Sequence, residues 1–128
     1  MAGYHVDIEK KSIENTYFRE VLFTGPHSQL VVMALKPGED IGLETHDDVD
    51  QFIRVEAGQG KAVLDGKEFQ LADGSAIVIP AGAEHNVINT SQSEPLKLYT
   101  VYTPPEHPDG TIHKTKAEAE EYEKKHHH

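Results

Sequence analysis

Short apolar runs, some of them alternating with polar residues, recur along most of this 128-residue chain and are separated by turn-forming residues. Runs of about four to eight residues of this kind are typical of β-strands. The pattern predicts strands over residues 17–24, 29–35, 41–46, 51–56, 61–64, 67–71, 76–79, 84–89 and 96–102. Asp65-Gly66 separates two of these runs and is typical of a tight β-hairpin turn. Many short strands at regular spacing indicate an all-β sandwich or barrel.

The two ends of the chain follow other patterns. Residues 1–15 are polar, and we expect a short arm there. Residues 103–113 contain three prolines, which predict an extended and fairly stiff loop. After this loop, Thr115 and Glu118 have the spacing of a helix capping box, and residues 116–125 contain good helix formers. A single helix is therefore expected near the C-terminal end.

Charge and composition exclude several classes of function. The chain has 22 acidic and 12 basic residues, a net charge of -10. Binding to nucleic acid or to anionic membranes needs clustered lysine and arginine, so we expect neither partner. No apolar run approaches the roughly 20 residues of a membrane span, and the first residues do not resemble a signal peptide. We therefore expect a cytoplasmic protein.

One segment offers candidate ligands for a metal. Glu44 and His46 are two positions apart, so on a strand both side chains point to the same face. Residues 47–50 form an acidic turn, and Gln51 then opens the next apolar strand. Two adjacent strands would thus present a carboxylate, an imidazole and an amide oxygen to one point. Such a donor set suits a divalent metal.

A second segment adds another histidine. Residues 77–79 form a short apolar strand, and the turn signal Pro80-Ala81-Gly82 follows it. His85 then opens the next strand, which Asn89 closes.

Together the two segments resemble the motifs of the cupin superfamily, G-x5-H-x-H-x3,4-E-x6-G and G-x5-P-x-G-x2-H-x3-N. The second motif is matched at all of its fixed positions, which are Gly74, Pro80, Gly82, His85 and Asn89. The first motif keeps its spacing from Gly38 to Gly58, but Glu44 replaces its first histidine and Gln51 replaces its glutamate.

The resemblance implies an all-β fold, the double-stranded β-helix or jelly-roll barrel of cupins, here with a short C-terminal helix. It also implies one divalent metal ion (Fe, Mn, Ni or Zn) held by Glu44, His46, Gln51 and His85. One carboxylate remains in this set, so its summed charge equals that of the usual cupin ligands. If Gln51 only forms hydrogen bonds, two histidines and one carboxylate remain, a set that recurs in non-haem iron oxygenases.

The segments of the chain divide accordingly. We expect an N-terminal arm with the first strand at 1–25, the cupin barrel at 26–103, and the proline-rich loop with the helix at 104–125. The three histidines at 126–128 resemble the remnant of a purification tag and are excluded from the chemistry.

Other polar residues have plainer interpretations. Asn89 is expected to form structural hydrogen bonds, and the acidic residues at 47–50 a solvated turn. His107 and His113 are expected to be loop histidines, with an acid or base role at the barrel mouth as the alternative. By strand alternation from Gln51, Arg54 points away from the metal face.

Three functions are compatible with these residues. The first is a small metalloenzyme that acts on a small oxygenated substrate, with dioxygenase-type chemistry slightly favoured. The second is a sugar-phosphate isomerase, which the few cations of the motif strands disfavour. The third is a non-catalytic cupin that binds a metal or a small molecule. We also expect a homodimer, in which the apolar stretches Tyr17–Phe23 and Gln29–Leu35 extend the sheet of a partner.

Overall fold

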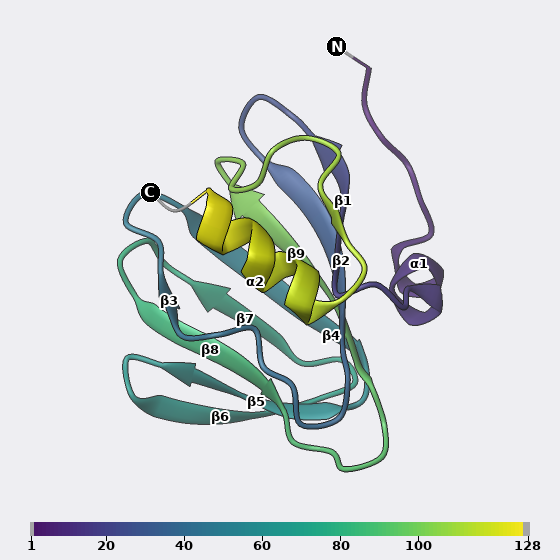
Figure 1. The fold of residues 1–128 in the computed structure, drawn as a ribbon, viewed down its shortest axis with the longest axis vertical. Coiled ribbons are helices and arrows are strands. Elements are labelled where there is room, and N and C mark those ends of the chain that lie inside the picture. Colours follow the sequence, from purple (N-terminus) through teal and green to yellow (C-terminus); the bar gives the residue numbers. More distant parts are fainter. Residues whose placement is uncertain (1, 127–128) are drawn as a thin grey trace.

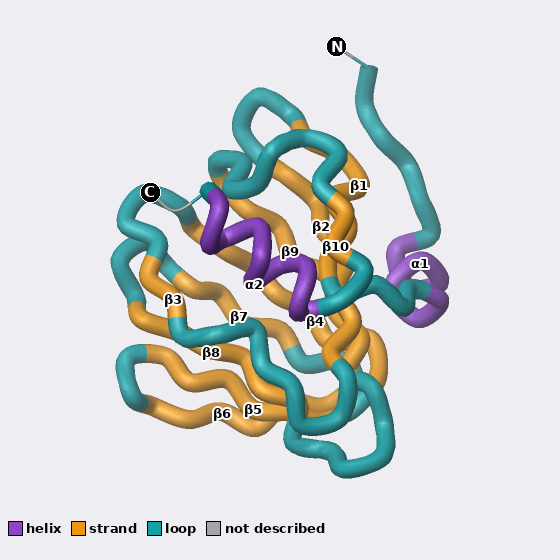
Figure 2. Tube along the Cα trace, in the orientation of Figure 1, coloured by secondary structure: helices purple, strands orange, loops and turns teal. Residues whose placement is uncertain are grey.

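The computed structural model of the protein describes residues 2–126, which form two antiparallel sheets and two helices (Figures 1 and 2). The strands are β1 (Arg19–Thr24), β2 (Gln29–Leu35), β3 (Glu44–Thr45), β4 (Asp50–Ala57), β5 (Gln59–Leu64), β6 (Lys67–Ala72), β7 (Ala76–Ile79), β8 (Glu84–Asn89), β9 (Leu96–Thr103) and β10 (Ile112–His113). The helices are α1 (Ile8–Glu14) and α2 (Lys116–Lys125). None of the helices within residues 2–126 is both long and apolar enough to cross a membrane.

The two sheets pack against each other as a jelly-roll barrel, which confirms the predicted fold class. The larger sheet has the strand order β10-β1-β2-β9-β4-β7, and the smaller has the order β3-β8-β5-β6. Strands that are neighbours in sequence, such as β3 and β4, therefore belong to different sheets. The barrel interior lies between the two sheets, and side chains from both of them reach it.

One end of the barrel interior is apolar. Inward residues of the larger sheet align across its strands through the antiparallel register. Leu35 lies beside Leu96, and the next row joins Met33, Leu98 and Val55. All five side chains are at most 1 % exposed, so this end supplies the hydrophobic core.

The opposite end of the same interior is polar. Two positions further along each strand, the rows continue with Thr100 beside Ile53, and then with Gln29, Tyr102 and Gln51 side by side. These residues are also buried. The change from apolar to polar side chains thus occurs at Thr100 on β9, and one row later, at Gln29 and Gln51, on β2 and β4.

Several predicted elements are confirmed to the residue, namely β2, β7, β8 and α2. The predicted hairpin is also present, because Asp65 and Gly66 both have positive φ, of 48° and 84°. Thr115 caps α2 by accepting a hydrogen bond from the backbone N–H of Glu118, at 3.1 Å. Glu118 in turn accepts from the backbone N–H of Lys114.

Three local predictions were wrong or incomplete. The strand expected at 41–46 is reduced to β3, because Gly42 has a φ of 112° that an extended strand does not allow. The N-terminal arm contains α1, whose first turn is capped by the side chain of Asp7. The loop at 103–113 contains β10, which pairs with β1 and so adds an edge strand to the larger sheet.

Helix α2 lies across the open side of the barrel, between β1 and β3 (Figure 1). Its Ala119 joins the core cluster, and Lys116 forms an ion pair with Asp40 in the segment before β3. His126 ends the helix and stacks on Tyr122, with ring centroids 4.0 Å apart. The other two histidines of the expected tag remnant, 127 and 128, lie outside the described residues.

Candidate metal centre

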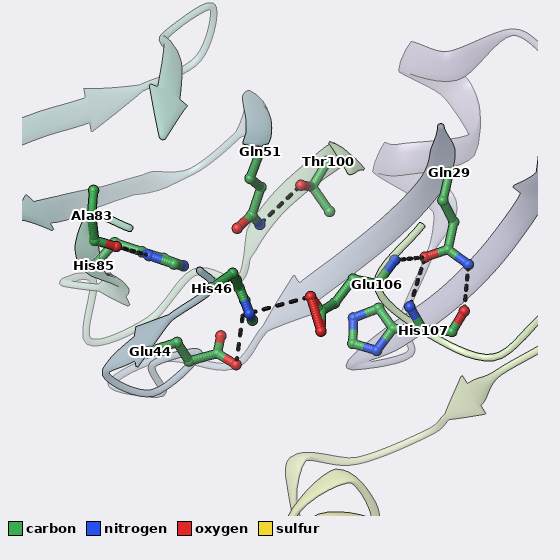
Figure 3. A network of polar contacts seen from close by, with 9 residues as sticks. All are labelled: Gln29, Glu44, His46, Gln51, Ala83, His85, Thr100, Glu106 and His107. Carbon is green, nitrogen blue, oxygen red and sulfur yellow. Dashed lines mark hydrogen bonds and ion pairs between the residues drawn. The ribbon is translucent and has the colours of Figure 1, made fainter. Parts of the chain in front are cut away.

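Three of the four expected ligands meet at the polar end of the barrel. Glu44, His46 and His85 each place one ligand atom within 4.8 Å of the others (Figure 3). Glu44 lies directly opposite His85, because β3 pairs with β8 at this position. The spacing of a histidine two residues after the glutamate then brings His46 to the same side, as the sequence predicts.

His85 is oriented for coordination through one nitrogen. Its Nδ1 lies 3.0 Å from the carbonyl oxygen of Ala83, so Nδ1 carries the proton and donates it. The lone pair is then on Nε2, which is buried and has no hydrogen-bond partner among the described residues. A buried polar atom without a partner is costly, and a metal ion would satisfy it.

His46 is held between two carboxylates. Its Nδ1 lies 3.2 Å from Oε2 of Glu106, and its Nε2 lies 3.8 Å from Oε2 of Glu44. The contact with Glu106 is on the Nδ1 side of the ring, and Nε2 is on the side of Glu44 and the candidate metal position. A carboxylate behind a ligating histidine is common in metal sites, where it orients the ring and raises its basicity.

Gln51, the fourth expected ligand, lies on β4 in the other sheet. Its Nε2 donates a hydrogen bond of 3.0 Å to Oγ1 of Thr100, which fixes the orientation of the amide. The amide oxygen is buried and has no partner within the described residues. In the view of Figure 3 the side chain of Gln51 points toward His46. The expectation of two adjacent strands was wrong, because β3 and β4 lie in different sheets and the centre is between them.

The turn after β7 organises the centre through its backbone. The N–H of Gly82 donates to the carbonyl oxygen of His46 at 2.8 Å, and the N–H of Ala81 donates to the carboxylate of Asp50 at 2.8 Å. The carbonyl of Ala83 holds the ring of His85. Gly82 has a φ of 89°, a conformation that L side chains rarely adopt.

Asn89 has the structural role that the sequence predicts. Its amide nitrogen donates to the carbonyl oxygens of Leu35 and Glu94, at 3.0 and 2.9 Å. Its oxygen accepts from the backbone N–H of Ser91. These bonds lie at the opposite end of β8 from His85. Asn89 therefore connects the end of β8 to the end of β2 and does not reach the candidate metal position.

Glu106 is the residue of this centre that the sequence did not reveal. It lies in the proline-rich loop, 60 positions after His46, and no motif spacing connects the two. The loop is held by the buried side chain of Gln29 (Figure 3). Oε1 of Gln29 accepts from the backbone N–H groups of Glu106 and His107, and its Nε2 donates to the carbonyl oxygen of His107 at 2.7 Å.

The carboxyl of Glu106 and the ring of His107 have shifted pKa values. Burial raises the pKa of Glu106, and the charge of the nearby His46 ring opposes this rise. Burial, and to a smaller extent the charge of Arg19, lower the pKa of His107 to about 3. His107 is therefore neutral at pH 7, where it packs edge-on against Tyr102 with ring centroids 5.2 Å apart.

The centre opens into a cavity of about 590 Å³ between the loop and α2. Its wall includes the carboxylates of Glu44, Glu106 and Glu123 together with the rings of His46 and His107. This volume falls within the usual range for small-molecule sites. His107 thus lies at the mouth of the barrel, as the alternative interpretation of this residue required.

The donor set fits a divalent cation. Two imidazole nitrogens, one carboxylate and one amide oxygen are the ligands of a borderline metal, and two of these atoms are buried without partners among residues 2–126. The set carries one formal negative charge. The structure does not identify the metal.

Comparison with known proteins places these features in a family. The family described as "Cupin domain" matches residues 31–102, which span β2 to β9 and include all four candidate ligands. The protein YrkC of Bacillus subtilis (strain 168) is 52% identical over 120 residues, which are 89% of this chain and 64% of YrkC. Protein L612 of Acanthamoeba polyphaga mimivirus is 49% identical over 113 residues, covering 85% of this chain and 70% of L612.

A solved structure shares nearly the whole fold. The crystal structure of BH2720 from Bacillus halodurans superposes with a TM-score of 0.91 at 45% identity, covering 94% of this chain and 95% of that chain. The chain spans less than two thirds of the length of YrkC, but almost all of BH2720. The similarity to BH2720 therefore extends beyond residues 31–102 into the segments on both sides of them.

Proposed function

Because this chain belongs to the cupin domain family, we propose that it is a small metalloenzyme that binds and converts a small oxygenated molecule at one divalent metal ion. Glu44, His46 and His85 are the proposed ligands, with the amide oxygen of Gln51 as a weaker fourth. A metal bound there would act as a Lewis acid on a substrate oxygen or, if it is iron, support dioxygen chemistry.

One observation carries this proposal. Nε2 of His85 and Oε1 of Gln51 are both buried without a partner among the described residues, although the other polar atom of each side chain has one. The protein therefore orients two lone pairs and leaves them unused. Stability alone does not explain this arrangement, because each orphaned atom costs about 1–3 kcal/mol.

Oxygenase-type chemistry is the reaction class we favour. A neutral amide oxygen is a weaker ligand than a carboxylate, so Gln51 leaves a set close to two histidines and one carboxylate. The residues around this set would prepare the substrate. Glu106 contacts the Nδ1 side of the His46 ring, and His107 lines the same cavity.

The test is the metal content of the protein and its consumption of dioxygen. Mass spectrometry is carried out on protein whose terminal histidines have been removed, because these would bind nickel. We expect about one metal ion per chain, lost in the double variant His46→Ala/His85→Ala. Iron-loaded protein is then supplied with small hydroxy and keto compounds in an oxygen electrode. A correctly folded protein that holds no metal would refute the proposal, whereas metal without oxygen consumption would leave only a binding or isomerase function.

The homodimer remains a prediction, but the strand edges expected from the sequence are not the best candidate for its interface. Strand β2 is paired along both of its edges, so it cannot extend the sheet of a partner. The outer face of the larger sheet is the better candidate, since Leu30, Val101, Phe52 and Val78 form one apolar row across four strands. Val78 is 65% exposed.

Light scattering at micromolar concentration tests this surface. We expect a dimeric mass for the natural chain and a monomeric mass for Val78→Lys. A monomeric natural chain would contradict the dimer.

A cytoplasmic location also remains a prediction.

A further inference from the structure

Arg19 is a buried cation without a matching anion. It opens β1, is 5% exposed, and is one of only two arginines in the chain. None of the ion pairs formed by residues 2–126 includes it. Buried charges in proteins are normally paired, because removing an ion from water costs several kcal/mol.

The contacts that Arg19 does make use little of its hydrogen-bonding capacity. One terminal nitrogen lies 3.4 Å from Nδ1 of His113, and the guanidinium lies 5.2 Å from the ring centroid of Phe18. Its Nε is buried and has no partner among the described residues. A guanidinium has five N–H donors in a planar fork, a shape that matches a carboxylate.

Arg19 shares a cavity wall with the candidate ligand Glu44. Both residues line a cavity of about 340 Å³ between β1, β3 and α2. Figure 1 shows these elements around the open side of the barrel. Glu44 and Glu123 also line the larger cavity that contains His46, so the two cavities adjoin at these side chains. A ligand bound beside Glu44 would therefore have Arg19 on the wall of the adjoining cavity.

The charges around the smaller cavity narrow the class of ligand. Glu44, Glu120 and Glu123 contribute carboxylates to its wall, and Arg19, Lys116 and Lys124 contribute cations. Lys116 is already paired with Asp40, so three carboxylates face the two cations Arg19 and Lys124. This small excess of negative charge repels a doubly charged phosphate more strongly than a singly charged carboxylate.

We propose that Arg19 binds a carboxylate group of the substrate, while a second oxygen group of the same molecule reaches the metal. This inference rests on the proposed metal function and names its substrate class, a small organic acid. A bidentate contact would pair the buried guanidinium and use donors that are otherwise unsatisfied. Arg19 is then a specificity-determining residue at the far end of the substrate from the metal.

Matched probes test the carboxylate contact by calorimetry on zinc-loaded protein. Malonate, succinate and glutarate are each compared with their monoamides, which lack one carboxylate but keep the chain length. We expect at least one diacid to bind about tenfold or more tightly than its monoamide. Arg19→Gln should abolish this preference with the zinc retained. Arg54→Gln is the control, because Arg54 is the other arginine and its side chain is 43% exposed.

A second readout keeps the test independent of any variant. With only two arginines, the Nε–H resonances of the natural protein are easily assigned, and the diacid should shift that of Arg19 but not that of Arg54. 3-Phosphonopropionate replaces one carboxylate of succinate by a phosphonate, and we expect it to bind more weakly. If it binds more tightly through Arg19, the subsite is one for phosphate and the carboxylate assignment is wrong.

The outcomes separate the two proposals. If zinc-loaded Arg19→Gln keeps the preference for the diacid, or if no diacid is preferred and the Arg19 resonance does not shift, the role of Arg19 is refuted while the metal function stands. If the protein binds no metal, the metal function fails. Acetate against acetamide on the metal-free protein then still tests Arg19 through its Nε–H resonance. If Arg19→Gln does not fold, Arg19→Lys, which keeps the charge but not the fork, should reduce the preference several-fold.

Discussion

The two ends of the barrel interior are built from the same strands but differ in the polarity of their side chains. On β9, Leu96 and Leu98 lie at one end, and Thr100 and Tyr102 at the other. The apolar end is filled mainly by hydrocarbon side chains, and the buried amide of Asn89 at that end has all of its bonds to the backbone. The polar end leaves nitrogen and oxygen atoms without partners among the described residues. We therefore expect stability to depend mainly on the apolar end, and the proposed metal binding on the polar end.

This division predicts that mutations at the two ends affect different properties. The largest expected effect is at the apolar end, where Leu98 is fully buried. Leu98→Ala should lower the free energy of unfolding by about 2–5 kcal/mol, because it removes apolar contacts and leaves a cavity. Denaturant titration measures the loss. Metal per folded chain should not change, and a Leu98→Ala protein of normal stability would show that the core lies elsewhere.

The second prediction concerns the metal ligands at the polar end. Glu44→Ala, His46→Ala and His85→Ala should each weaken metal binding by more than about 100-fold, because each removes the only charged ligand or a nitrogen donor. Gln51→Ala should weaken it by only about tenfold, since water can replace a neutral oxygen. Bound metal after dialysis is measured, with thermal melting as the folding control. Full occupancy in Glu44→Ala together with loss in Gln51→Ala would overturn this ranking.

A smaller effect is expected for the carboxylate behind His46. Glu106→Gln keeps the size of the side chain but removes its charge, so His46 becomes a poorer donor. We expect metal affinity to fall about tenfold, at the lower end of the usual range for such partners. Glu123→Gln is the matched control, because it lines the same cavity without contacting His46. Equal affinities in the two variants would remove Glu106 from the metal centre.

The smallest predicted effect is a pH dependence at the mouth of the barrel. Burial lowers the pKa of His107 to about 3, whereas an unfolded histidine titrates near 6.5. Between these values the unfolded chain binds a proton that the folded chain does not, so stability falls as the pH falls below about 6.5. From pH 6.5 to pH 5 we expect this histidine to account for about 1–2 kcal/mol.

The comparison of natural protein with His107→Gln isolates that contribution, since other groups titrate in the same range. Unfolding free energies are measured at both pH values in the two proteins. The natural protein should lose more stability on acidification than the variant does. Parallel losses would show that the ring of His107 is solvated in the folded state.

Sequence reasoning found the residues whose spacing is imposed by a strand or a tight turn. Glu44 and His46 share a face because alternate residues of a strand do, and the Pro80–Gly82 turn sets the position of His85. Glu106 and Arg19 were not found. Their surroundings depend on how the loop and the edge strand β10 return to the barrel, and the chain carries no local pattern that encodes such a return.

The position of Gln29 in the chain has a consequence for the order in which the centre is assembled. Gln29 belongs to the second strand, yet its side chain holds the backbone of Glu106 and His107, almost eighty residues later. A growing chain that has been synthesised as far as the end of β9 already contains all four metal donors. It still lacks the carboxylate behind His46 and the segment that carries His113 beside Arg19. An early metal ion would therefore meet a weaker and more open site. The last fifth of the chain completes this site by docking onto the side chain of Gln29, which was synthesised much earlier.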